Sequence, residues 1–242
     1  FRDAQTGLWA KFNPQEVAST EAFRKSPQLV WDWYVHRAEF VRKADPNHGH
    51  MAVAELQSLV PEVTVITQNI DNLHQKAGSK DVLELHGILF RLKAFVDPEE
   101  IPDPNVSQVI CHVCDGYAVH EHCDPYATKE DLAAIALEAG PVPRCPGCGS
   151  LLRPDIVWFG EPLDINILEG AMRVADSCDL MICIGSSLEV QPAASIPYRA
   201  KWGKAIVIEV NPEPTHFSFE ADVFVQGRAA VELPKILNEV SP

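Results

Sequence analysis

The sequence lacks any apolar run that approaches the roughly 20 residues needed to cross a bilayer. Basic residues are also scarce: 20 Lys and Arg stand against 34 Asp and Glu, which leaves a net charge of −14. No basic cluster or basic helix face interrupts this acidic surplus, which argues against binding a phosphate backbone as the main task. We therefore expect a soluble globular protein with neither a membrane partner nor a nucleic-acid partner.

Cysteine is too scarce for a disulfide scaffold. The chain has seven cysteines in 242 residues, and 46% of its residues are hydrophobic, so it can bury a core without covalent staples. Internal repeats and low-complexity tracts are absent as well. The length suits one large α/β domain that carries a small inserted module, and we expect a monomer.

Short apolar runs alternate with helical patterns along most of the chain. Strands are predicted at residues 63–67, 180–184, 205–210 and 223–225. Helices are predicted at residues 16–23, 27–43, 49–59, 165–177, 193–202 and 229–240. This alternation is typical of a Rossmann-like parallel sheet with helices on both faces, which binds its ligand at the carboxyl ends of the strands.

Residues 91–153 break this alternation. They contain two cysteine pairs, much of the proline and polar stretches such as DPEEIPDPN. We predict that they form a small inserted module, while residues 1–90 and 154–242 form the α/β domain.

One helix is predicted inside this module, at residues 128–140. Thr128 is placed to cap its first turn and Asp131 to reach back to the cap, which is the reciprocal arrangement of a capping box. Gly140 is expected to end the helix, because glycine readily adopts the left-handed conformation found at helix C-termini.

The two Cys-x-x-Cys pairs of the module indicate a metal site. Cys111 with Cys114, and Cys145 with Cys148, can each present two sulfurs from a tight turn. Four thiolates complete a tetrahedral zinc site and leave no open position, so the predicted zinc is structural. The 30 residues between the pairs, 115–144, exceed the usual spacing. Alternative ligands nearby are His120, His122 and Cys123.

The richest run for chemistry is TQNIDNLHQKAG, residues 67–78, followed by LELHG, residues 83–87. A buried strand that ends in such a run places amides and a carboxylate at the ligand edge of the sheet. The side chains concerned are Gln68, Asn69 and Asp71. A single histidine such as His86 is more often structural than catalytic, but its place beside this run favours a catalytic role.

The helical run WDWYVHRAEF, residues 31–40, carries Tyr34 and Arg37 three residues apart. Residues at this spacing share a helix face, so a phenol and a guanidinium point into the same space. Taken alone, the pair is typical of a surface arginine that packs its stem over a ring.

These motifs together resemble the sirtuins, the family of NAD-dependent protein-lysine deacylases. TQNIDNLHQKAG…LELHG looks like the family signature, and FRD followed by Leu8 and Trp9 looks like the end of its cofactor loop. Further matches are PNHGH at 46–50, LLRPDIVWFGE at 151–161, GSS at 185–187 and Asn211. The cysteine pairs fall where the family has its zinc ribbon, so the resemblance covers nearly the whole chain.

The resemblance implies a reaction. Sirtuins transfer the acyl group of a modified lysine to the ADP-ribose of NAD+, releasing nicotinamide and 2′-O-acyl-ADP-ribose. His86 matches the family's catalytic position, where a neutral imidazole serves as general base. The implied NAD+ contacts are Phe1, Arg2, Trp9, Gln68, Asn69, Ile70, Asp71, Gly185, Ser186, Ser187, Asn211, Pro212, Glu213 and Ala229. The implied contacts to the acylated lysine peptide are Val157, Phe159, Gly160 and Glu161.

Tyr34 and Arg37 match the Tyr-x-x-Arg pair of the class III branch, which resembles desuccinylases, demalonylases and deglutarylases. A succinyl-lysine ends in a carboxylate, and burying that charge requires a cation and a further donor. Ala18 lies where this branch has a small residue. The alternatives are a plain deacetylase or ADP-ribosyltransferase on the same fold, and a silent zinc module that reads acylated tails.

The sequence departs from the family pattern in two places. The glycine-rich Gly-Ala-Gly-x-Ser loop would precede Phe1, so we expect this chain as given to bind NAD weakly, and expect the natural N-terminus and any targeting peptide upstream. The compartment, whether mitochondrial, cytoplasmic or nuclear, is therefore open. In addition, 23 residues, 88–110, separate Gly87 from Cys111, where the family usually has a handful.

Overall fold

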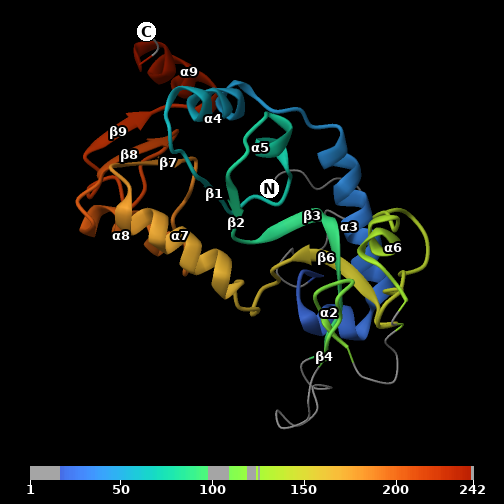
Figure 1. Ribbon diagram of the computed structural model, residues 1–242. Helices are drawn as coiled ribbons and strands as arrows, with labels where there is room; N and C mark the ends of the chain where they lie inside the picture. Colours follow the sequence, from blue (N-terminus) through green and yellow to red (C-terminus); the bar gives the residue numbers. More distant parts are fainter. Residues whose placement is uncertain (1–16, 98–108, 119–123, 125, 241–242) are drawn as a thin grey trace. The chain divides into compact units, whose positions relative to one another are not determined.

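The computed structural model describes residues 17–97, 109–118, 124 and 126–240 (Figure 1). Contacts divide the chain into two compact units. Unit 1 comprises residues 1–43 and 87–162, and unit 2 comprises residues 44–86 and 163–242. In the part of the chain that is described, no helix is long and apolar enough for a membrane span.

Unit 2 contains the parallel strands. β7 (Leu180–Ile184), β8 (Ile206–Asn211) and β9 (Val223–Gln226) form a three-stranded parallel sheet in that order. β1 (Val65–Thr67) and β2 (Val82–Glu84) form a second parallel pair. Most residues of β7–β9 are apolar and many are β-branched, the composition expected of strands covered on both faces. The predicted parallel α/β fold is confirmed.

Helices cover both faces of the β7–β8–β9 sheet, as Figure 1 shows. α4 (His48–Leu59) and α9 (Ala229–Val240) pack on one face together with Ile182 and Ile184 of β7. α7 (Ile165–Ser177) and α8 (Ile196–Trp202) pack on the other face, together with Met181 and Cys183 of β7. The predicted helix at 193–202 starts as a short 3-10 turn at Ala193–Ser195.

The core on the α7–α8 face is built on alanine. Ala171, Ala175 and Ala200 are all fully buried, and their small side chains allow α7 and α8 to approach Val207 and Cys183 closely. The same cluster includes Leu85, which follows β2. One apolar core therefore holds both parallel sheets of unit 2 and fixes the strand ends that carry polar residues.

Unit 1 is built on the antiparallel pair of β3 (Gly87–Ala94) and β6 (Leu152–Ile156). Its helices are α2 (Thr20–Lys25), α3 (Pro27–Arg42) and α6 (Lys129–Ala133), and a small ladder joins β4 (Val109–Ile110) to β5 (Tyr117–Ala118). The boundaries drawn from the sequence at 90/91 and 153/154 fall inside β3 and β6. Because β3 and β6 pair along their length, the residues on either side of each boundary belong to the same antiparallel pair of strands.

The helix predicted at residues 128–140 is wrong in length. Its capping box is present, since Thr128 Oγ1 accepts from the Asp131 backbone N–H at 3.3 Å and the Asp131 carboxylate accepts from the Thr128 N–H at 2.8 Å. The helix nevertheless ends at Ala133, well before Gly140.

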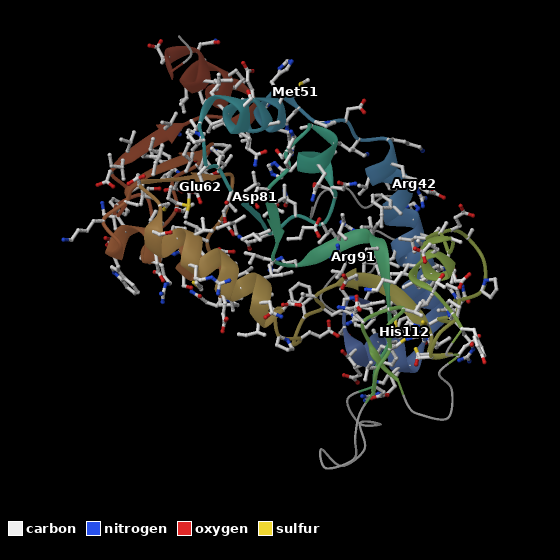
Figure 2. All side chains as sticks on the ribbon, viewed as in Figure 1. Arg42, Met51, Glu62, Asp81, Arg91 and His112 are labelled. Carbon is white, nitrogen blue, oxygen red and sulfur yellow. The ribbon has the colours of Figure 1, made fainter. Side chains whose placement is uncertain are left out.

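Side chains of α3 explain the early end of α6. Arg42, labelled in Figure 2, donates to the carbonyl of Leu137 at 2.6 Å, and Trp31 Nε1 donates to the carbonyl of Glu138 at 3.0 Å. Both carbonyls accept these bonds in the non-helical path that residues 135–140 take, so the contacts with α3 stabilise this path over a longer helix. The capping pattern correctly predicts where the helix begins, and contacts with α3 decide where it ends.

Candidate active site

His86 lies in the turn that follows β2, and one hydrogen bond orients its ring. Its Nδ1 is 3.0 Å from the carbonyl oxygen of Gln68. A carbonyl can only accept, so Nδ1 carries the proton and Nε2 keeps the lone pair of the neutral imidazole. Burial lowers the pKa of His86, and the weaker effect of the Gln68 bond opposes this shift. The imidazole is therefore held neutral and able to take up a proton.

The polar ends of three strands in unit 2 are joined by hydrogen bonds. Gln68, after β1, donates through Nε2 to Ser186 Oγ at 3.4 Å. Asn211, at the end of β8, donates through Nδ2 to the Ser186 carbonyl at 2.9 Å. Gly185 adopts a φ of 59°, a left-handed conformation that glycine tolerates without a Cβ clash, where the chain turns after β7. Three of the predicted cofactor contacts thus meet at the carboxyl edge, where a ligand of such a sheet binds.

A cavity of about 450 Å³ opens beside these strand ends, a size typical of small-molecule sites. It is lined by Gly185, Ser187, Glu189, Asn211, Glu213, Pro214, Thr215 and His216. Four of these are among the predicted cofactor contacts, and four, Glu189, Pro214, Thr215 and His216, are not. Of the other predicted contacts, Pro212 uses its carbonyl to accept from Gln226 and Ala229 begins α9.

A buried carboxylate supports one wall of this cavity. Glu209 in β8 is 1% exposed, and its two oxygens accept from Thr215 Oγ1 at 2.8 Å and Ser218 Oγ at 2.6 Å. Two hydroxyl donors compensate part of the cost of burying the charge. The sequence carried a signal for this residue, because a glutamate interrupts the apolar run IVIEV.

The predicted contacts after Gln68 form a tight loop. The Asn69 backbone N–H donates to Thr67 Oγ1 at 3.0 Å, and Asp71 Oδ1 accepts from the Leu73 N–H at 3.0 Å. Asn72, between Asp71 and Leu73, has a positive φ of 64°. α5 (Leu73–Lys76) begins directly after it. Ile70 is half-buried, whereas Asn69 is exposed.

Two histidines that the sequence analysis did not single out lie near this loop. The rings of His50 and His74 meet edge to face with centroids 4.9 Å apart. Burial lowers the pKa of each, and the charge of Asp71 acts in the opposite direction on both. Both rings are therefore kept neutral beside the Asp71 carboxylate.

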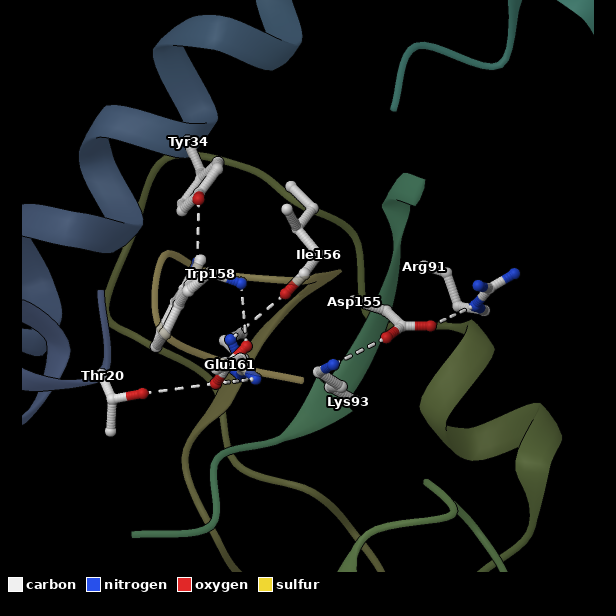
Figure 3. Close-up of polar contacts among 9 residues, drawn as sticks. Thr20, Tyr34, Arg91, Lys93, Asp155, Ile156, Trp158 and Glu161 are labelled. Atoms are coloured by element: carbon white, nitrogen blue, oxygen red, sulfur yellow. Dashed lines mark hydrogen bonds and ion pairs between the residues drawn. The ribbon is translucent and has the colours of Figure 1, made fainter. Parts of the chain in front are cut away.

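Tyr34 in α3 is a buried phenol rather than a surface ring. It is 2% exposed, and its hydroxyl oxygen accepts from Trp158 Nε1 at 2.8 Å (Figure 3). Burial raises the pKa of Tyr34 and exceeds the opposing effect of the Trp158 bond. The phenol therefore stays protonated. Trp158 donates to the Tyr34 hydroxyl oxygen, so the hydroxyl hydrogen of Tyr34 can still be donated to another acceptor.

Arg37 lies one turn along α3 and is half-buried. Its guanidinium carbon is 4.8 Å from the centroid of the Trp33 ring. Burial lowers the pKa of Arg37, with Tyr34 acting in the opposite direction, and an arginine stays charged in such a setting. α3 therefore presents a partly desolvated cation beside a phenol donor.

The carboxylate of Glu161 is engaged within unit 1. It accepts from Arg153 at 2.7 Å, from the Trp158 backbone N–H at 2.9 Å and from Thr20 Oγ1 at 3.3 Å (Figure 3). The guanidinium of Arg153 also lies 3.8 Å from the centroid of the Trp158 ring. Glu161 thus fixes the tryptophan that binds Tyr34. The sequence motif indicates a role for Glu161 and none for Arg153, Trp158 or Thr20.

The other predicted peptide contacts follow β6. The Phe159 backbone N–H donates to the carbonyl of Ala18 at 3.1 Å, which ties these two predicted residues together. Ala18 is buried, Val157 is half-buried and Phe159 is exposed. Gly160 adopts a φ of 89°, which turns the chain sharply after Phe159.

The structure brings the four paired cysteines together. Their sulfur atoms lie within 4.8 Å of one another, all four side chains are buried and none forms a disulfide. Cys114 Sγ and Cys148 Sγ are 3.9 Å apart, close to the edge of about 3.8 Å in a tetrahedron with Zn–S bonds of about 2.3 Å. The donor set can therefore hold one zinc ion.

A further contact braces the first cysteine knuckle. His112, labelled in Figure 2, donates through Nε2 to the carbonyl of Ala127 at 3.0 Å, which links the Cys111–Cys114 turn to the chain before α6. His120, His122 and Cys123 lie outside the described residues, as do the predicted cofactor contacts Phe1, Arg2 and Trp9.

The chain is similar to known proteins over nearly all of its length. A profile of the Sir2 family matches residues 1–192. The NAD-dependent protein deacylase of Pyrococcus furiosus is 41% identical over 234 residues, which are 97% of this chain and 84% of that protein. The crystal structure of a Sir2 homolog–NAD complex has a TM-score of 0.77 and 36% identity, over 99% of this chain and 82% of that chain. A structure of Sir2 bound to an acetylated peptide has a TM-score of 0.72 and 30% identity, over 93% of this chain and 83% of that chain.

Proposed function

Because the chain belongs to the Sir2 family and is an NAD-dependent protein deacylase, we propose that it prefers lysines with negatively charged acyl groups: succinyl, malonyl or glutaryl. The observation that carries this proposal is the pair of Tyr34 and Arg37 on α3. The substrates are acylated lysine side chains of protein partners.

The pair suits a carboxylate for a physical reason. A succinyl group ends in an anion, and desolvating an anion without a partner costs several kcal/mol. Arg37 is itself partly desolvated, and its planar guanidinium can bind both oxygens of a carboxylate. Tyr34 is held protonated by burial and can donate a further hydrogen bond. Ala18, small and buried, leaves room for the longer acyl chain.

The roles of the remaining residues follow from their chemistry. NAD+ supplies the ADP-ribosyl group that accepts the acyl group, with loss of nicotinamide. His86, neutral and with Nε2 free of a proton, takes up a proton from a ribose hydroxyl. Gln68, Asn69 and Asp71 orient the nicotinamide end, assisted by Ile70.

The cavity at the strand ends suits the other end of the dinucleotide. Ser186, Ser187 and Asn211 offer hydroxyls and an amide at the carboxyl edge of the sheet, where nucleotides bind in such folds. Val157, Phe159 and Gly160 follow the substrate peptide, and Glu161 braces this segment through Arg153. Cys111, Cys114, Cys145 and Cys148 hold one structural zinc.

A plain deacetylase is the second candidate, because one similar structure contains an acetylated peptide. An ADP-ribosyltransferase on the same fold is a further one. Turnover with labelled NAD distinguishes a deacylase from an ADP-ribosyltransferase. A deacylase places the label in O-acyl-ADP-ribose, whereas a transferase places it on protein. A silent acyl-lysine reader would release no nicotinamide.

Arg37→Met tests the acyl preference. We expect kcat/KM for a succinyl peptide to fall by about 1.5–3 kcal/mol, or roughly 10- to 150-fold, since a hydrogen-bonded charge pair is lost. Turnover of the matching acetyl peptide should change little, because an acetyl group has no carboxylate. Arg173→Met, which removes an exposed arginine of α7, serves as the control and should alter neither rate. Equal losses on both peptides in Arg37→Met would refute the proposed preference.

A further inference from the structure

Trp33 carries a buried hydrogen-bond donor that has no partner in the described part of the chain. The side chain is 1% exposed, and Nε1 is buried without an acceptor. Leaving such a donor unsatisfied costs about 1–3 kcal/mol, and a buried indole N–H normally has a partner. An acceptor supplied by a bound molecule would remove this cost.

Two other tryptophans of unit 1 behave differently. Trp31 and Trp158 are each 1% exposed, as Trp33 is. Trp31 Nε1 donates to the carbonyl of Glu138 at 3.0 Å, and Trp158 Nε1 donates to the hydroxyl of Tyr34 at 2.8 Å. Two comparable indoles of unit 1 therefore have acceptors, whereas the Trp33 donor has none among the described residues.

The Trp33 ring lies beside the predicted acyl contacts. The guanidinium carbon of Arg37 is 4.8 Å from the Trp33 ring centroid, and the Tyr34 ring meets the Trp33 ring edge to face at 4.8 Å and 81°. One turn of α3 thus gathers a cation, a phenol hydrogen and an indole N–H. All three favour an anionic acceptor.

We propose that Trp33 is a specificity-determining residue whose Nε1–H donates to the acyl carboxylate held by Tyr34 and Arg37. This inference rests on the proposed preference for negatively charged acyl groups. An ionised carboxylate has about four acceptor sites. The guanidinium fork occupies two and the phenol a third, so the indole takes a remaining one. An acetyl group offers no carboxylate and leaves the donor unpaired, which increases the discrimination between the two substrates.

Trp33→Phe tests the contribution of the indole N–H separately from that of the aromatic ring. Phenylalanine keeps an aromatic surface under Arg37 and against Tyr34 but has no N–H. We expect kcat/KM for a succinyl peptide to fall about 10-fold, the low end for a hydrogen bond to a charged group, and that for the acetyl peptide to stay within about two-fold. The ratio of the two rates is measured in one preparation, so partial misfolding does not affect it.

Trp31→Phe is the matched control. It makes the same change two residues earlier on α3, to an indole whose N–H already binds a backbone carbonyl. It should lower the melting temperature and leave the succinyl-to-acetyl ratio unchanged.

The outcomes distinguish this inference from the proposed function. If the wild type prefers succinyl peptides and Arg37→Met abolishes that preference, an unchanged ratio in Trp33→Phe overturns the role of Trp33 alone. Equal losses on both peptides in Trp33→Phe would also overturn it, since they indicate a packing role. If the wild type shows no preference for charged acyl groups, the proposed function fails and the role of Trp33 fails with it.

Discussion

At the residue scale, two opposing influences act on the imidazole of His86. Burial disfavours the charged ring and lowers the pKa, while the Gln68 carbonyl at 3.0 Å favours the proton on Nδ1 and acts more weakly in the other direction. Burial outweighs the hydrogen bond, so the pKa of His86 lies below the ordinary histidine value of about 6.5. A base in this environment is ready to act at neutral pH.

This shift has a testable consequence for the pH profile. The neutral ring is the active form, so kcat/KM should decline on the acid side only as pH falls through an apparent pKa below 6.5. A pH series of deacylation rates with one peptide measures it. His48→Asn, a change at an exposed histidine of α4, should keep the same profile, whereas His86→Asn should lose turnover. An acid limb centred above 6.5 would contradict this assignment of the base.

The sequence identifies residues of this kind unevenly. Motif order and spacing are sufficient to single out His86, Gln68 and the Tyr34–Arg37 pair. They give no role to Trp33, and they show Glu209 only as a charge within an apolar run, because the hydrogen-bond partners of a buried group are its neighbours in the fold. Those neighbours become known only when the chain has folded.

At the element scale, Gly87 determines how β3 pairs with β6. Its φ is 74°, and a Cβ at this position would lie 2.0 Å from the carbonyl oxygen of Asp155. Only glycine permits this approach, because the neighbour is backbone of the paired strand and cannot move aside. The residue after His86 is thus constrained by the strand ladder.

Gly87→Ala should therefore destabilise the protein strongly. We expect a loss of more than about 2 kcal/mol in the free energy of unfolding, since left-handed strain adds to a backbone clash. Gly78→Ala is the control: its φ of 104° is also positive, but nothing lies within 4 Å of the added Cβ, so only strain of about 1–2 kcal/mol remains. Urea unfolding of both variants measures the difference, and equal losses would show that the contact with Asp155 carries no cost.

Elements with a local sequence pattern have the bounds that the sequence predicts. α7 and α9 have the predicted bounds, because each shows helical periodicity over its full length. β3 was not predicted, since its stability depends on pairing with β6, about 60 residues further along. α6 was predicted too long for the same reason, because partners on α3 end it.

At the scale of the whole molecule, the cysteine cluster joins distant parts of unit 1. The two knuckles are separated by 30 residues, and their four sulfurs lie within 4.8 Å of one another. Bound zinc would hold the chain around β4, β5 and α6 in place. Without metal, four thiols would be buried with few partners.

Removing the metal should therefore weaken the fold. We expect one zinc per chain by elemental analysis, and a melting temperature lower by about 10 °C after chelation, since a structural zinc contributes several kcal/mol. Cys145→Ser should reproduce this loss. Cys178→Ser, at a half-buried cysteine in unit 2, should change neither the zinc content nor the melting temperature by a comparable amount. An unchanged melting temperature after complete zinc removal would exclude a structural role.

The sequence by itself determined the parallel α/β class, the two cysteine pairs and the polar residues at strand ends. These follow from periodicity and spacing, which are properties of neighbouring residues. Only the tertiary structure decided which buried donors find partners: Trp158 reaches Tyr34 across 124 positions in the chain, while Trp33 Nε1 has no acceptor among the residues that the structure describes. The physical reason is that hydrogen-bond satisfaction in a core depends on groups far apart in sequence, and no local pattern encodes their meeting.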